Sequence, residues 1–68
     1  MNTLSRLNRL IGQTMTALRK AAGFKRDCLA LTLAWLNRAR VALRKGYELT
    51  YAHNIKCANY YARLAAVS

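Results

Sequence analysis

One histidine and two cysteines are the residues of this sequence best suited to metal or thiol chemistry. His53 and Cys57 stand four positions apart, so a helix would present the imidazole and the thiol on one face. With Cys28 as a further ligand, the pair could begin a zinc site, because thiolate sulfur and imidazole nitrogen are preferred ligands of Zn²⁺. A cysteine nucleophile would use the same pair, with His53 as its base.

The expected register keeps the two thiols apart. An antiparallel pair of helices that turns at Gly46 puts Cys28 opposite about position 64 and Cys57 opposite about position 35. The mismatch is about seven residues, or roughly 10 Å along the helix axis. This separation exceeds the reach of a shared metal ion and of a disulfide. We therefore expect no metal site within one chain, while a zinc ion or a Cys57 contact shared between two copies stays open.

Groups for other kinds of catalysis are missing from the sequence. Asp27 and Glu48 are the only acids, and each stands where a helix is expected to begin, so two carboxylates in one cleft are not expected. Serine occurs only at Ser5 and Ser68, close to the ends of the sequence. No glycine-rich phosphate-binding loop is present, and neither an orienting acid nor an oxyanion loop accompanies Cys57. We expect no enzymatic activity and no cofactor.

Positive charge is the strongest signal in the sequence. Lys and Arg number 12 against 2 Asp and Glu, which gives a formal net charge of +10, while 54% of the residues are hydrophobic. That apolar content argues against a disordered basic tail. Arginine is the commoner cation, and its guanidinium binds phosphate or carboxylate through two hydrogen bonds. Without acids to pair them, the cations repel one another, and a polyanion would relieve that repulsion.

Helices must position these side chains. Proline is absent and glycine occurs three times in 68 residues, too rarely for a fold rich in turns. Apolar residues recur every three or four positions, which predicts helices over about 3–22, 27–45 and 47–66. Asn2 or Thr3 is the expected N-cap of the first helix, and Gly23 its left-handed stop. Asp27 and Glu48 are expected in the first turns of the second and third helices.

The predicted fold class is all-α: one domain over 1–68, folded as a small antiparallel three-helix bundle or a helical hairpin. Alanine pairs three or four positions apart are expected to let helices approach closely; these are Ala30 with Ala34, Ala39 with Ala42, and Ala58 with Ala62. The expected buried stripe of the third helix is Tyr47, Tyr51, Ile55, Ala58, Ala62 and Ala65. A core this small is marginal, so we also expect self-association into a homo-oligomer.

Antiparallel packing gathers the cations at two poles of the bundle. The first pole is expected to hold Arg19, Lys20, Lys25 and Arg26. The second is expected to hold Arg38, Arg40, Arg44 and Lys45, joined by Arg6 and Arg9. A further row on the third helix combines aromatic and basic side chains that could stack a base and hold its phosphates; it consists of His53, Lys56, Tyr60 and Arg63.

These features favour a small binding protein of a bacterial or viral type that contacts the backbone of RNA or DNA with little readout of bases. A second hypothesis is an inhibitor or adaptor that docks on an acidic protein surface, since Trp35, Tyr47, Tyr51, Tyr60 and the arginines are typical interface residues. A third is action at membrane surfaces through the basic amphipathic first helix, which we expect less. The longest apolar run, 28–36, is too short to span a bilayer, and the few cysteines favour the cytoplasm.

Overall fold

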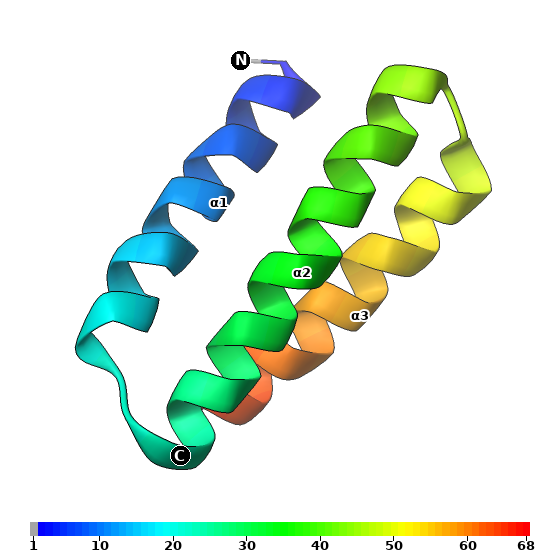
Figure 1. Cartoon of the computed structure of the whole chain (residues 1–68). Coiled ribbons are helices and arrows are strands. Elements are labelled where there is room, and N and C mark those ends of the chain that lie inside the picture. Colours follow the sequence, from blue (N-terminus) through cyan, green and yellow to red (C-terminus); the bar gives the residue numbers. More distant parts are fainter. Residues whose placement is uncertain (1) are drawn as a thin grey trace.

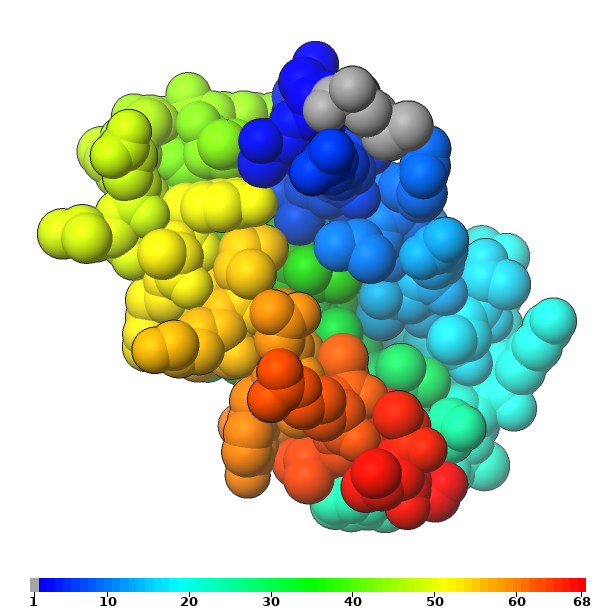
Figure 2. All heavy atoms as spheres, turned by 180° about the vertical axis from the view of Figure 1, so that it is seen from behind, coloured from blue at the N-terminus to red at the C-terminus, as the bar shows by residue number. Residues whose placement is uncertain are grey.

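Three antiparallel α-helices form the protein, with the middle helix between the other two (Figure 1). The computed structural model describes residues 2–68, in which α1 is Thr3–Lys20, α2 is Gly23–Lys45 and α3 is Glu48–Ala66. Helix α2 packs against both neighbours, and within the described chain α1 and α3 have no close backbone contact. From behind, atoms of α2 remain visible between α1 and α3 (Figure 2). The predicted all-α three-helix bundle is confirmed.

Helix α1 begins as the sequence predicts and ends earlier. The Oδ1 atom of Asn2 accepts a hydrogen bond from the backbone N–H of Ser5 at 2.7 Å, which confirms Asn2 as the N-cap. The helix ends at Lys20, and Ala21, its C-cap, is already extended. Gly23 does adopt the left-handed region, with φ of 64°, but it opens α2 and does not end α1. The prediction of Gly23 as the stop of the first helix is therefore wrong.

Helix α2 begins at Gly23, four residues before the predicted start. Its N-cap, Ala22, makes no side-chain capping bond, and no acid lies in its first turn. Asp27 consequently lies one turn inside the helix, so the prediction that places it in the first turn is wrong. Residues 24–26 contain no helix breaker, and each added residue gains a backbone hydrogen bond once a helix has formed. This gain lengthens the helix without a capping side chain.

The turn between α2 and α3 is a Schellman motif around Gly46. The glycine is left-handed, with φ of 77°, and its N–H donates to the carbonyl of Leu43 at 3.2 Å. The N–H of Tyr47 donates to the carbonyl of Ala42 at 2.9 Å, which closes the motif. Helix α3 follows at once, with Glu48 in its first turn as predicted. The short turn makes α2 and α3 a tight antiparallel hairpin.

The main core joins all three helices near the middle of the bundle. It is formed by Leu7, Ile11, Leu36, Ala39 and Ala58. Ala39 is fully buried and Ala42 is 3% exposed, so this predicted alanine pair does line a buried face of α2. Small side chains at that position let a neighbouring helix approach closely.

Several of the other predicted packing positions are exposed. Ala30 and Ala34 are exposed, and so is Ala62, so neither of their pairs forms a packed face. In the predicted buried stripe of α3, Tyr47 is also wrong, because it precedes the helix and is 57% exposed. Asn54 takes a buried place on this side of α3 instead, with 5% of its surface exposed.

A second cluster closes the end of the α2–α3 hairpin that lies farther from Gly46. Cys28, Leu29 and Ala65 are buried there, and Leu64 packs against them. Cys28 therefore lies opposite position 64, which is the register that the sequence predicts. Cys57 lies farther up α3, beside Trp35 in the wall of one surface pocket. The hairpin thus holds the two thiols at different levels, and both are free.

In residues 2–68, none of the three helices is both long enough and apolar enough to cross a bilayer. The expected self-association into a homo-oligomer stays a prediction.

Candidate functional site

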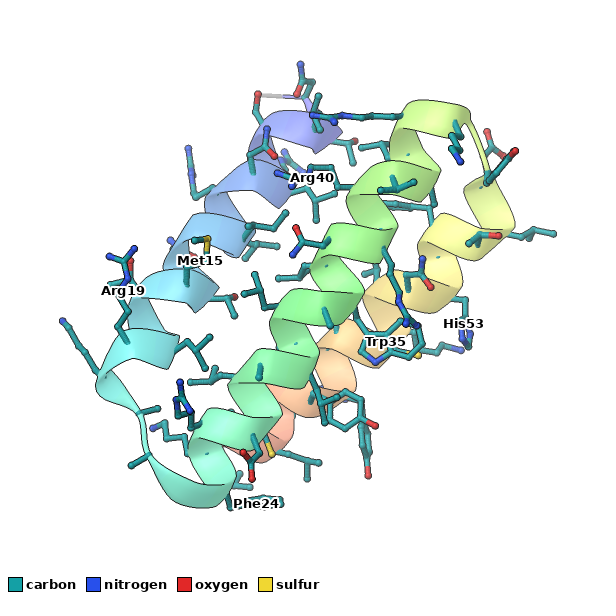
Figure 3. The ribbon with its side chains drawn as sticks, in the orientation of Figure 1. Met15, Arg19, Phe24, Trp35, Arg40 and His53 are labelled. Carbon is teal, nitrogen blue, oxygen red and sulfur yellow. The ribbon has the colours of Figure 1, made fainter. Side chains whose placement is uncertain are left out.

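The first cationic pole surrounds the turn between α1 and α2. Arg19 and Lys20 occupy the last turn of α1, and Lys25 and Arg26 the start of α2. All four side chains are exposed. Lys20 and Lys25 line one shallow hollow, so the turn brings cations of two helices together. Arg19 projects from the outer edge of α1 near this turn (Figure 3).

The second pole lies at the opposite end, where α1 starts and α2 finishes. Arg40 joins the two helices: one of its nitrogens donates to Oδ1 of Asn8 in α1 at 3.3 Å, and another to Oδ1 of Asn37 at 3.2 Å. Arg6, Arg9 and Arg44 are exposed around it. The packing of α1 against α2 therefore brings Arg40 to α1, while Arg38 and Lys45, which were predicted for the same pole, line a surface pocket between α2 and α3 instead.

Arg38 lies elsewhere, on the face formed by α2 and α3. Its guanidinium carbon lies 4.8 Å from the centroid of the Trp35 ring, in cation–π geometry. His53 of α3 meets the same indole edge-to-face, at 5.9 Å between centroids and an interplanar angle of 84°. Figure 3 shows Trp35 on this face, with His53 beside it at the edge of α3. The indole thus holds one cation and one imidazole against a single aromatic surface.

Two surface pockets share Trp35 as a wall. The first, the Asn54 pocket, has a volume of about 360 Å³. It is lined by Trp35, Arg38, Val41, Ala42, Lys45, Tyr47, Thr50 and Asn54. The second, the His53 pocket, has a volume of about 300 Å³. It is lined by Trp35, His53, Lys56, Cys57, Tyr60 and Tyr61. Together they make one continuous face of aromatic and basic side chains, which we call the aromatic face.

Asn54 is one of the polar residues that line the first pocket. Its side chain makes no hydrogen bond within residues 2–68, although the residue is only 5% exposed. No side-chain nitrogen or oxygen of the described chain is both sealed from solvent and without a partner. The polar atoms of the Asn54 side chain therefore remain accessible to solvent, where they can donate and accept hydrogen bonds.

The predicted row on α3 is brought together in part. His53, Lys56 and Tyr60 line the His53 pocket, and the ring of Tyr60 meets that of Tyr61 edge-to-face, at 5.1 Å between centroids. Arg63 does not line this pocket; it is exposed in the last turn of α3. The row therefore offers two aromatic groups and one cation at a single site, with Trp35 as their neighbour.

The thiol and imidazole chemistry suggested by the sequence has little support from the geometry. The Sγ atom of Cys57 lies 3.6 Å from Nε2 of His53, so the two do share a helix face. Over residues 2–68, however, no group of three His, Cys, Asp or Glu side chains is arranged to hold a metal ion. Cys28 is buried in the second cluster, away from this pair.

Electrostatic pairing within the protein is sparse. Leaving Arg9 aside, none of the Lys and Arg side chains in the described chain makes an ion pair with Asp27 or Glu48. Both acids are themselves exposed. The positive charge of the first pole is therefore directed at solvent.

Sequence reasoning missed two parts of this site. Asn54 stands three positions after Tyr51 and four before Ala58, so helical spacing alone would have placed it on the stripe of α3 that faces α2. The stacking of Arg38 on Trp35 follows from their spacing of three, which also puts both on one face of a helix.

No family model, curated protein or solved structure matches this chain. Fold and site together define its class as a small basic three-helix bundle with two cationic poles and an aromatic face.

Proposed function

We propose that this protein binds nucleic acid, RNA or DNA, through the phosphate backbone and with little readout of base edges. The observation that carries this proposal is that the first pole consists of exposed cations without acidic partners in the described chain. Unpaired cations repel one another in the folded protein, and neutralisation by phosphates removes that repulsion and releases counterions from the nucleic acid.

The dimensions of the bundle suit contact at two points on a backbone. Its longest extent is 35 Å, and α2 runs from the first pole to the second. One turn of a DNA duplex is also about 34–36 Å long. The two poles can therefore contact phosphates about one turn apart, while the middle of the bundle lies along the groove edge between them.

The aromatic face extends the same function to unpaired strands. Trp35 is half-buried and Tyr47 and Tyr60 are exposed, and Arg38, Lys45 and Lys56 line the same pockets. Single strands bind best where aromatic rings stack with bases and cations follow the phosphates. This arrangement supports binding of the backbone first, with stacking as a second contribution.

A titration with salt tests the proposal. The purified, nuclease-treated protein is mixed with a labelled DNA duplex of generic sequence, and the association constant is measured by fluorescence anisotropy over a range of salt concentrations. We expect binding at about 50 mM salt, with log K falling against log salt by about 0.9 for each phosphate contacted. Several contacts therefore give a steep line.

Matched variants separate the poles from the total charge. Arg19→Gln combined with Lys20→Gln lowers the slope by about 1.8 if both side chains contact phosphate. Asp27→Asn combined with Glu48→Gln raises the net charge by the same amount and is expected to tighten binding without changing the slope. Absence of binding at about 50 mM salt, or an association constant that does not respond to salt, contradicts the proposal.

A further inference from the structure

We propose that Cys57 and His53 form half of a zinc site, which a second copy of the chain completes with the same two side chains. Two thiolates and two imidazoles, one of each from either copy, hold a single Zn²⁺ ion between them. Nucleic-acid binding plays no part in this site. The shared ion gives the expected self-association a definite cause and places its interface at the outer edge of α3.

The distance between the two ligand atoms fits a tetrahedral metal ion. Sγ of Cys57 lies 3.6 Å from Nε2 of His53. Zinc binds thiolate sulfur at about 2.3 Å and imidazole nitrogen at about 2.0–2.1 Å, so a tetrahedral angle separates the two ligand atoms by about 3.5–3.6 Å. Bonds of the same lengths at a right angle, as in square-planar Cu(II) or Ni(II) sites, bring them to about 3.1 Å. The pair is therefore already spaced as two corners of a tetrahedron.

The fold supports the pair in this geometry. Their spacing of four puts both side chains on one face of α3. The indole of Trp35 meets the imidazole edge-to-face at 5.9 Å between centroids, and Arg38 stacks on the same indole. A ring supported in this way has less freedom to turn away from the thiol. Ligands that neighbouring groups orient in advance bind a metal ion more tightly.

The chemistry of the two ligands selects zinc. Magnesium and calcium take oxygen ligands, whereas thiolate and imidazole in a tetrahedral arrangement are typical of Zn²⁺. As zinc binds, each Cys57 thiol releases its proton to solvent, and each His53 binds through Nε2 as a neutral imidazole. The two thiolates together balance the charge of the Zn²⁺ ion. The completed site therefore adds no net charge beside the basic side chain of Lys56, which lines the same pocket.

One chain supplies only half of the ligands. Within residues 2–68, no group of three His, Cys, Asp or Glu side chains is placed to hold a metal ion, and Cys28 is buried in another cluster. A structural zinc site needs four ligands. In a two-fold dimer both copies use the same surface, so an ion on the axis receives the same pair from each. Two ligands per copy match the number that zinc requires.

The pair lies where a second copy can reach it. His53 is exposed, and Cys57 is half-buried in the wall of the His53 pocket. Figure 3 shows His53 at the outer edge of α3, on the side away from α1. Tyr60 lines the same pocket and is 59% exposed, so it offers an aromatic surface to the partner. Tyrosine is enriched at such interfaces.

The charge of the protein opposes pairing in the absence of metal. Each copy carries a formal net charge of +10, so two copies repel one another. Bonds to zinc overcome this repulsion, and salt screens it. We therefore expect the zinc dimer to strengthen as salt rises, whereas binding to nucleic acid weakens.

Sedimentation with and without zinc tests the proposal. The nuclease-treated, reduced protein is studied by sedimentation equilibrium, first in EDTA and then with one zinc ion added per two chains. We expect a mass of 7.7 kDa in EDTA and twice that mass with zinc. Titration of zinc against a chromophoric chelator is expected to saturate at one ion per two chains. Cobalt in place of zinc is expected to show the visible absorption of a tetrahedral site together with a thiolate charge-transfer band.

Variants assign the ligands. His53→Gln and Cys57→Ser are each expected to weaken zinc binding by more than about a hundredfold, because loss of a group that only supports a ligand already costs about 10–100-fold. Lys56→Gln is the matched control: it changes an exposed neighbour in the same pocket, and it is expected to dimerise with zinc as the wild type does. Cys28→Ala controls for the other thiol. Circular dichroism establishes that each variant is folded, and the exposed His53 decides the result if Cys57→Ser does not fold.

Three results would overturn the shared site. Zinc bound at one ion per chain, without a change in mass, shows that solvent supplies the remaining ligands. A mass that is the same in EDTA and in zinc shows that the metal does not join the copies. A zinc-dependent dimer that persists in both His53→Gln and Cys57→Ser assigns the ion to other side chains. None of these results alters the salt titration with DNA, so the proposed function stands or fails separately.

Discussion

Arg40 and Asn8 connect α2 to α1 across 32 positions of sequence. The guanidinium nitrogen lies 3.3 Å from Oδ1 of the asparagine, and a second nitrogen of the same group is bonded to Asn37. Arg40 is half-buried, unlike the exposed Arg38 and Arg44 on either side of it. It is therefore the cation of the second pole that contributes to the fold as well as to the charge.

Replacing Arg40 tests that structural contribution. Arg40→Met keeps the apolar stem and removes the guanidinium, so we expect the free energy of unfolding to fall by about 1 kcal/mol, the net value of a typical hydrogen-bonded contact. Arg44→Met removes the same charge from an exposed side chain that has no such bond. Urea unfolding followed by circular dichroism measures both variants. Equal stability of the two would show that the contact with Asn8 stabilises nothing.

Close packing at Ala39 gives a second prediction. The residue is fully buried where α2 meets the main core, so Ala39→Leu forces the helices apart and should lower the free energy of unfolding by about 1–3 kcal/mol. Ala34→Leu adds the same side chain at an exposed position of α2 and should change stability by less than about 0.5 kcal/mol. Thermal melts of the pair measure the difference. If Ala39→Leu proved as stable as the wild type, the core would have room for three more carbon atoms, which contradicts the close packing at Ala39.

The glycines Gly46 and Gly12 should respond in opposite directions to the same substitution. Gly46 is left-handed in the Schellman motif, so Gly46→Ala should cost about 1 kcal/mol even though a Cβ there would meet nothing within 4 Å. Gly12 lies inside α1, and its Cβ would also meet open space, so Gly12→Ala should add about 0.5–1 kcal/mol. Chemical denaturation curves for the two variants check the signs. Two shifts of the same sign would refute the assignment of these conformations.

The helices were predictable from the sequence because their signals are local. Apolar spacing and the lack of proline define them, Asn2 marks the first start, and Glu48 the third. The level of Cys28 opposite Leu64 was also predictable, since the turn at Gly46 and the rise per residue determine it.

The start of α2 was not predictable in the same way. An aspartate such as Asp27 is typical of a helix start, but α2 extends over residues 24–26 and begins at Gly23. The sequence alone does not show which is larger, the stabilisation from an acid in the first turn or that from three more helical residues.

The candidate site was predictable only in its charges. The poles follow from antiparallel packing, which the sequence favours. The spacing of three brings Arg38 over Trp35, but whether that pair lies toward α1 or toward α3 depends on which face of α2 meets each neighbour. The burial of Asn54 follows from its helical spacing with Tyr51 and Ala58, but its place in the lining of a surface pocket depends on how α3 packs against α2. Tertiary packing therefore supplied the part of the site that could recognise a ligand.

The wall shared by the two pockets has a practical consequence. Trp35 is the single tryptophan of the sequence, and it borders the Asn54 pocket and the His53 pocket alike. Whatever enters either hollow alters the polarity around that one indole. Its emission therefore reports occupancy of the aromatic face directly, and the unlabelled protein carries its own optical probe for any search among candidate ligands.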